Sequence, residues 1–323
     1  MKNTRTMRRA MALGLAGILA TSLVACGGQS LEEVEGGGDG EAVDLSSVEF
    51  AEVHDEEAAK DIVEALEPVQ EIHDLLPNEY KTGLTWTTSS GYPPMEIFAS
   101  NNKDLLGVDP AMAHAISRVL GVPMTMEDAD FNAMIPGLVS GRYDVLVSSM
   151  TDTEERRETT TFVNYVQSGN AFLVEGGNPL GIEEPMDLCG KTVAVVDAGS
   201  SAALAEELSA ACEEAGEAPY DILPFPGDQD ANLSLESGRS QATVTDYPVA
   251  VARAADENNN MDAVVIEGGE SVWGIGVDNA NADLAVAIQA ALQHLMDDGA
   301  YAEILAAWEV DAMALDTATI NGE

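Results

Sequence analysis

From Lys81 onward the sequence alternates short apolar segments with longer amphipathic ones. The short segments have the length and branched side chains of buried strands: 84–88, 145–147, 192–196, 242–244 and 273–277. The longer ones repeat apolar residues every three or four positions, as helices do: 109–120, 131–140, 202–215, 284–296 and 301–308. This alternation predicts an α/β protein with open parallel sheets. A chain of 323 residues is expected to form two such units.

Two helix starts are marked by capping residues. Asp109 precedes Pro110, a pair typical of an N-cap followed by the first helical position. Thr151 and Glu154 have the spacing of a capping box. We therefore expect a helix to begin at Thr151 and to carry Arg156 within its first turns.

The charge balance excludes several kinds of partner. The chain has 57 acidic and 14 basic residues, for a formal net charge of −43. Nucleic acid or an anionic lipid surface would require clustered basic residues, and none follows residue 10. The 46 % apolar content argues against disorder. So acidic a surface is typical of adaptation to a saline extracellular medium, where salt screens the repulsion.

The first 26 residues have the order of an export signal. Four basic residues precede an apolar run over 10–25: Lys2, Arg5, Arg8 and Arg9. That run ends in Leu23-Val24-Ala25-Cys26, which resembles the bacterial lipobox. We therefore expect a lipoprotein signal peptide over 1–25 and a lipid, including palmitate, on Cys26. Such an anchor would hold the protein on the extracellular face of the cell membrane. An ordinary signal peptide with a chance cysteine is the alternative.

Two segments separate this signal from the strand–helix alternation. Residues 26–47 are rich in glycine and glutamate and are expected to form a flexible tether. Residues 48–81 place apolar side chains among acids at helical spacing, with Pro68 expected to kink or split the helix. We interpret 48–81 as an acidic helical extension packed on the main body, with a disordered segment as the alternative.

The other two cysteines, Cys189 and Cys212, are expected to form a disulfide in an exported protein, or else to be buried free thiols. The four histidines are scattered without the spacing of zinc ligands: His54, His73, His114 and His294. We expect neither a metal nor a cofactor.

Polar residues gather where the predicted strands end, which is where open α/β sheets bind ligands. Arg156 lies one turn beyond them, and the others are Tyr92, Ser148, Ser149, Thr151, Gly199, Ser200, Ser201 and Asp246. No histidine lies near the serines in sequence, so a nucleophile paired with a base is not indicated, and no catalytic residue is expected. A guanidinium can bind a carboxylate and an aspartate an ammonium group, so the set suits a zwitterion such as a free amino acid.

Several motifs resemble the family 3 extracellular solute-binding proteins of polar amino acid ABC transporters. Those motifs are Gly107-Val108-Asp109, Met134-Ile135-Pro136, Gly141-Arg142-Tyr143-Asp144, the segment 150–156 and the segment 298–304 with Trp308. The similarity covers about residues 82–310, and Met150 to Arg156 is its most specific part. It implies a two-lobe periplasmic binding protein type II fold, also called a Venus flytrap. Lobe 1 would comprise 82–173 and 272–323, and lobe 2 would comprise 174–271.

The resemblance also assigns roles within the cleft. Arg156 would bind the ligand carboxylate with help from Thr151 and the Ser201 backbone, and Asp246 would bind the α-ammonium group. Tyr92 would stack on the ligand, and Ser148 and Ser149 would offer backbone and hydroxyl contacts. Ordinary structural roles stay open for three of these residues: an ion pair for Arg156, a turn cap for Asp246, and packing on Pro94 for Tyr92.

The resemblance weakens the case for a cationic ligand. Relatives that select cationic side chains often place an acid just before the aromatic residue, and this chain has Ser89-Ser90-Gly91 there. A polar or neutral amino acid is therefore favoured over lysine, arginine or histidine. The implied partners are an ABC permease and its ATPase, and the protein is expected to be a monomer. A periplasmic dehydratase of cyclohexadienyl acids and a sensory ligand-binding module are the alternatives on the same fold.

Overall fold

The computed structural model describes residues 55–256 and 258–323. The expected signal peptide, the tether, Cys26 and the first residues of the extension lie outside the described residues. Within the described part of the chain, none of the helices combines the length and apolar character needed to cross a membrane.

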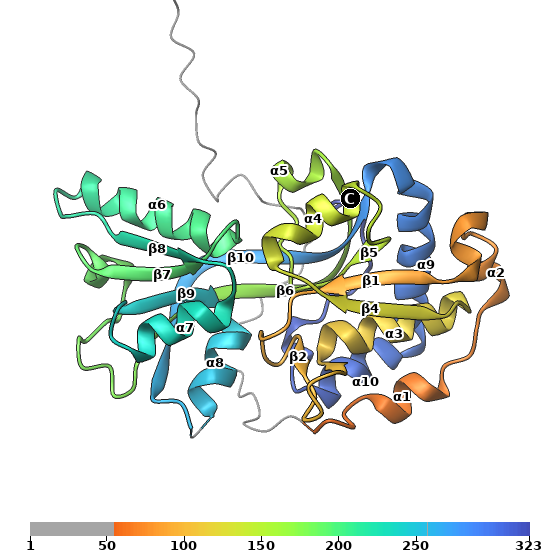
Figure 1. The fold of residues 1–323 in the computed structure, drawn as a ribbon, viewed down its shortest axis with the longest axis horizontal. Coiled ribbons are helices and arrows are strands. Elements are labelled where there is room, and N and C mark those ends of the chain that lie inside the picture. Colours follow the sequence, from red (N-terminus) through yellow and green to blue (C-terminus); the bar gives the residue numbers. More distant parts are fainter. Residues whose placement is uncertain (1–54, 257) are drawn as a thin grey trace, which may run out of the picture. The chain divides into compact units, whose positions relative to one another are not determined.

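Eight strands form one mixed sheet, in the order β4-β1-β5-β10-β6-β9-β7-β8 (Figure 1). Their bounds are β1 Leu84–Thr88, β4 Met124–Asp128, β5 Val145–Leu146, β6 Thr160–Glu175, β7 Thr192–Val196, β8 Asp221–Phe225, β9 Ala242–Asp246 and β10 Met261–Asp278. Two short strands, β2 Ile97–Phe98 and β3 Leu105–Leu106, pair separately. The sheet is parallel within β4-β1-β5 and within β9-β7-β8, and antiparallel in between.

Helices α3, α4, α6, α9 and α10 lie where the sequence pattern predicts helices, whereas α7 and α8 were not predicted. Their bounds are α1 Lys60–Ala65, α2 Gln70–His73, α3 Val108–Leu120, α4 Phe131–Val139, α5 Glu154–Arg157, α6 Ser200–Glu214, α7 Asp228–Glu236, α8 Tyr247–Ala255, α9 Ala282–Asp298 and α10 Ala300–Ala307. Figure 1 shows α6 on one side of β7 and β8 and α7 on the other. Short 3-10 helices lie at Asn78–Thr82, Pro185–Leu188, Asn279–Asn281 and Asp311–Met313.

Strands β6 and β10 form a long antiparallel pair at the centre of the sheet. They comprise 16 and 18 residues, and their register shifts between Ile266 and Ser271 and again between Trp273 and Gly274. The sequence pattern indicated only residues 273–277 of β10 and no strand over β6. Both parallel sets of strands attach to this pair, β5 to β10 and β9 to β6.

Two predicted helix N-caps are each wrong by two residues. Helix α3 begins at Val108 with Gly107 as its N-cap, and the Asp109 side chain makes no cap. Helix α5 has Thr153 as its N-cap, and the Thr153 side chain accepts a hydrogen bond from the Arg156 N–H. In both cases the residue expected to cap is buried and bonded elsewhere. Arg156 nevertheless lies in the helix that the sequence predicted.

The described part of the acidic extension packs on the main body. Its helix is split between Ala65 and Gln70, and Pro68 lies in the break. His73 Nδ1 lies 2.7 Å from the carbonyl oxygen of Leu120, at the end of α3. Apolar side chains of the extension contact the large core cluster: Ile62, Val63, Leu66, Val69, Ile72 and Leu76.

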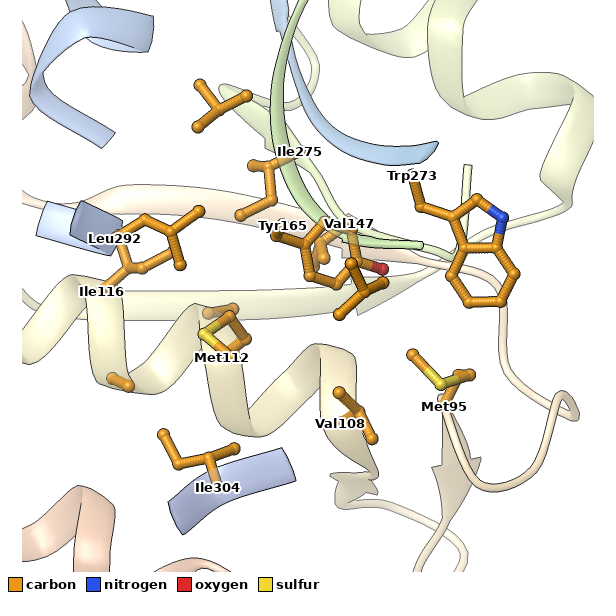
Figure 2. Close-up of a cluster of buried hydrophobic side chains, with 14 of the residues drawn as sticks. Met95, Val108, Met112, Ile116, Val147, Tyr165, Trp273, Ile275, Leu292 and Ile304 are labelled. Atoms are coloured by element: carbon orange, nitrogen blue, oxygen red, sulfur yellow. The ribbon is translucent and has the colours of Figure 1, made fainter. Parts of the chain in front are cut away.

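The largest hydrophobic cluster lies between α3, α9, α10 and the central strands. Figure 2 shows α3 and α10 side chains beneath those of the strands, among them Met112, Ile116, Ile304, Tyr165 and Ile275. A second cluster is built around β7, β9 and α6. Cys189 and Cys212 are joined by a disulfide that ties α6 to the segment before β7. Each parallel set of strands thus has its own apolar packing, and the ends of those strands are free to carry polar residues.

Candidate ligand-binding site

A cavity lies where strands β1, β5, β7 and β9 end. Its lining comes from the loops after β1 and β5, the turn before α6, the turn before α7 and the last residue of β9. All sequence-predicted ligand residues except Thr151 and Arg156 line it. The full lining is Ser89, Ser90, Tyr92, Glu96, Phe131, Ser148, Ser149, Val196, Gly199, Ser200, Ser201, Gly227, Asp228 and Asp246.

Arg156 borders this cavity with its guanidinium on backbone carbonyls. Its Nη1 donates to the Thr151 carbonyl oxygen at 2.7 Å, and its Nη2 donates to the Ala198 carbonyl oxygen at 3.0 Å. The guanidinium carbon lies 5.6 Å from the centre of the Phe131 ring, which lines the cavity. Two of its five N–H groups are thus engaged by neutral acceptors. The arrangement fixes the position of the cation without neutralising its charge.

Burial lowers the pKa of Arg156 to about 10, and the charge of Asp246 acts in the opposite direction. The side chain therefore stays protonated at neutral pH. Thr151, expected beside it, donates from its hydroxyl to the Ser200 hydroxyl at 3.0 Å. Arg157, the adjacent cation, instead forms a bidentate pair with Asp152, with distances of 2.5 Å and 3.0 Å. The structure thus separates a structural arginine from one at the cavity.

Asp246 places a buried carboxyl group at the same cavity. It is the N-cap residue of α8, but its side chain does not cap the helix. Instead, the Tyr92 hydroxyl donates to Asp246 Oδ2 at 2.5 Å and lies 3.2 Å from the Thr245 hydroxyl. Burial raises the pKa of Asp246 to about 7. The Tyr92 hydrogen bond opposes this rise, and the nearby Asp228 charge adds to it. At neutral pH this group can exist in both protonation states.

Two further carboxyl groups at the cavity were not predicted from the sequence. Glu96 accepts from the Ser148 hydroxyl at 2.7 Å and from the Ser149 hydroxyl at 3.3 Å. Asp228 pairs with Arg253, whose Nη2 lies 2.8 Å from Asp228 Oδ2. The same Nη2 donates to the Gly91 carbonyl oxygen at 2.6 Å. Arg253 thus connects α8 with the loop after β1.

Only weak signals in the sequence could have indicated these residues. Glu96 is a lone acid two residues after the proline pair Pro93-Pro94, so its charge could have been noted. Asp228 follows β8, which was not predicted because Pro224 interrupts its apolar pattern. Without that strand there was no reason to place Asp228 at a strand end.

A larger hollow lies elsewhere, beside the β6–β10 pair, with a volume of about 1100 Å³. Its charged lining residues are all acidic: Glu183, Glu184, Asp187, Glu267 and Glu270. It therefore lacks a cation for a carboxylate ligand, and the smaller cavity remains the candidate site. Among the residues that the structure describes, no cluster of three or more His, Cys, Asp or Glu side chains could hold a metal ion.

The sequence profile of the bacterial extracellular solute-binding proteins, family 3, matches residues 84–311. This chain belongs to that family. Its architecture is the two-lobe periplasmic-binding-protein fold of amino acid-binding proteins. The family resemblance in the sequence motifs is therefore confirmed.

One similar relative is the arginine-binding protein ArgT of Corynebacterium glutamicum, 30 % identical over 260 residues, which are 79 % of this chain and 84 % of that protein. A solved structure of an ancestral arginine-binding protein bound to glutamine is 31 % identical, with a TM-score of 0.65, and covers 71 % of this chain and 98 % of that one. The arginine-bound structure of an ancestral arginine-binding protein is 32 % identical, with a TM-score of 0.62, covering 70 % and 97 %. The relatives are substrate-binding proteins of ABC transporters, which are not enzymes.

Proposed function

We propose that this protein captures a free amino acid in the cavity bordered by Arg156 and Asp246 and delivers it to an ABC permease. The observation that carries the proposal is the pairing of one guanidinium with one buried carboxyl group at a single cavity. An α-amino acid supplies a carboxylate as the partner of the guanidinium and an ammonium group as the partner of the buried carboxyl group. Family membership supports the same function, because family 3 proteins are the amino acid-binding components of ABC importers.

The ligand carboxylate would bind to the remaining N–H groups of Arg156. The backbone N–H groups at the start of α6, beginning at Ser200 and Ser201, add a positive dipole end beside it. The α-ammonium group would bind to Asp246 in its ionised form. Thr151 then acts indirectly, because its hydroxyl is bonded to the Ser200 hydroxyl and its carbonyl holds Arg156.

At neutral pH the cavity favours a polar or neutral side chain over a cationic one. Asp228, which could attract a cation, is already paired with Arg253. The Glu96 carboxyl group is hydrogen-bonded by two serine hydroxyls, and burial raises its pKa well above the usual range, which favours its neutral form. The remaining wall is hydroxyl and apolar, from Ser89, Ser90 and Phe131.

Capture would involve closure of two lobes over the ligand, with lobe 1 comprising 82–173 and 272–323 and lobe 2 comprising 174–271. The central strands β6 and β10 supply the connection between them. Ligand contacts from both lobes would select the closed form. The protein would act as a monomer, held outside the cell membrane by lipid on Cys26 and by the tether 26–47.

The test is a thermal-shift screen of the mature protein against the twenty amino acids, followed by calorimetric titration of those that stabilise it. We expect one or a few polar amino acids to raise the melting temperature. Arg156→Ala should lose at least about a hundredfold in affinity, because a buried charge pair loses one partner. Arg157→Ala is the matched control and should retain most of the affinity. Absence of binding by all twenty amino acids would refute the proposal.

A further inference from the structure

Two fully buried carboxyl groups adjoin each other at one wall of the cavity. Glu96 lines the cavity and is 1 % exposed, and Asp109 from the first turn of α3 is 0 % exposed. Both groups accept from the Ser149 hydroxyl, Glu96 Oε2 at 3.3 Å and Asp109 Oδ2 at 3.4 Å. Two buried carboxyl groups that share one donor repel each other when both are ionised, so a proton on one of them is favoured. We call these two residues the carboxyl pair.

The donors to the carboxyl pair are neutral. Ser148 donates its hydroxyl to Glu96 Oε1 at 2.7 Å, Ser149 its backbone N–H to Asp109 Oδ2 at 2.7 Å, and Tyr165 its hydroxyl to Asp109 Oδ1 at 2.6 Å. Hydroxyl and amide donors can stabilise one negative charge in this position. They do not compensate two, because like charges this close repel strongly in a buried site.

The other charged groups around the cavity are engaged elsewhere. Arg156 is held on the carbonyls of Thr151 and Ala198, and Arg253 is paired with Asp228. Asp246 is hydrogen-bonded to the Tyr92 hydroxyl, and like Asp228 it adds negative charge. The titratable group that faces the carboxyl pair from β6 is Tyr165, whose pKa is raised well above its usual range by burial. None of these groups supplies the positive charge that a doubly ionised pair would need.

Electrostatics agree with a retained proton. Burial, followed by the Asp109 charge, raises the pKa of Glu96 well above the usual range. Burial raises the pKa of Asp109 to about 6, against the opposing effect of the Tyr165 hydrogen bond. Asp109 therefore loses its proton first, and Glu96 keeps its proton to a higher pH than Asp109 does.

The proposed contacts of Arg156 and Asp246 with the α-carboxylate and α-ammonium groups leave this wall for the ligand side chain. We propose that the carboxyl pair binds the far end of that side chain and releases its remaining proton to solvent when the side chain is cationic. A neutral side chain would be held by the singly protonated pair, which offers one donor and several acceptors. This inference rests on the proposed function and adds a pH-dependent choice between side-chain classes.

The pair of ligands that isolates this effect is L-arginine and L-citrulline, which have the same length and nearly the same shape but differ in charge. The ratio of their association constants should rise with pH, because only arginine binding releases the proton. The slope approaches tenfold per pH unit within the titration range, and we expect at least about a tenfold rise between pH 5.5 and 8.5. Asp246 and the ligand α-ammonium group affect both ligands equally and cancel in the ratio.

Calorimetry of the wild-type protein measures the released proton directly. Titrations at one pH in phosphate and in Tris, whose ionisation enthalpies differ, should give a larger buffer dependence of the binding enthalpy for arginine than for citrulline, because the Asp246 proton contributes equally to both ligands. Glu96→Gln keeps the shape of the side chain and removes the shared proton, so its affinity ratio should not change with pH. Glu79→Gln, at an exposed acid, is the matched control and should retain the wild-type slope.

A wild-type affinity ratio constant within twofold over this pH range would overturn the inference, and so would an equal buffer dependence of the binding enthalpy for arginine and citrulline. Both measurements use the unaltered protein, so they decide the matter even if Glu96→Gln does not fold. Binding of other amino acids but of neither probe would overturn this inference and leave the proposed function intact. If none of the twenty amino acids bound, both would fail.

Discussion

Removal of the Arg253 side chain should destabilise the protein because it leaves a buried carboxylate without its cation. The Arg253 side chain is 17 % exposed and that of Asp228 is 4 % exposed. Breaking a buried pair from one side costs about 3–5 kcal/mol. Asp228 would keep a donor from Asn232 Nδ2 at 2.7 Å and a weaker one from the Thr245 hydroxyl at 3.4 Å. The Gly91 carbonyl oxygen would lose the donor that Arg253 Nη2 supplies. We therefore expect Arg253→Ala to lower the free energy of unfolding by about 2–3 kcal/mol.

The assay is urea unfolding at equilibrium, followed by tryptophan fluorescence, with a double-mutant cycle. Arg253→Ala combined with Asp228→Asn should recover at least half of the loss, because the stranded charge is gone. The exposed pair Arg142–Glu127, 3.6 Å apart, is the control, and its cycle should give a coupling energy below about 0.5 kcal/mol. A loss below about 0.5 kcal/mol for Arg253→Ala, or strictly additive effects in its cycle, would refute the reasoning.

Three further outcomes are expected. Replacing Cys189 and Cys212 by serine should cost about 3 kcal/mol in urea unfolding, because the cysteines are 23 positions apart; an equal stability of the two forms would contradict this. Gly107→Ala should cost about 3 kcal/mol, since its φ is 126° and a Cβ would lie 2.1 Å from the Met95 carbonyl oxygen; an unchanged melting temperature would exclude the strain. Calorimetric titration should give amino acid affinities that fall up to tenfold per pH unit below about pH 7, because Asp246 is protonated there and no longer attracts the ammonium group. The variant Asp246→Asn should bind weakly, and its affinity should depend little on pH.

The sequence predicted the parts of this fold whose signals are local. Strands β1 and β7 match their predicted bounds, because β-branched residues recur along both and a tryptophan adds to this pattern in β1. Helix α3 ends at Gly121 because this residue has a left-handed backbone conformation, which glycine adopts readily. Strand β6 was missed because Asn164, Gln167 and Asn170 interrupt its apolar run. The Asn164 side chain donates to Asp152 and accepts from the Thr319 hydroxyl and the Gly322 N–H. No local sequence pattern reveals these tertiary partners.

The candidate site divides in the same way. Asp246 ends a strand and Arg156 lies in a helix that the sequence predicted, and a family motif covers the segment that contains Arg156. The carboxyl pair is different, because Glu96 and Asp109 were each interpretable as an ordinary turn or capping residue. Their importance arises from burial and from contact with Ser148 and Ser149, about 40 to 50 residues away. Tertiary contacts of that kind determine protonation, and a linear pattern does not contain them.

The position of β10 within the sheet has a consequence for how the molecule is made. This strand lies between β5 and β6, although it follows them in the chain by about a hundred residues. The central hydrogen-bond ladder therefore cannot form until the chain has been synthesised past Asp278. Pairings of such long sequence separation fold slowly, because the intervening loop must be ordered first. A nascent chain would thus remain incompletely folded until nearly its full length is available, a period in which a translocation machinery could still engage it as an extended polymer.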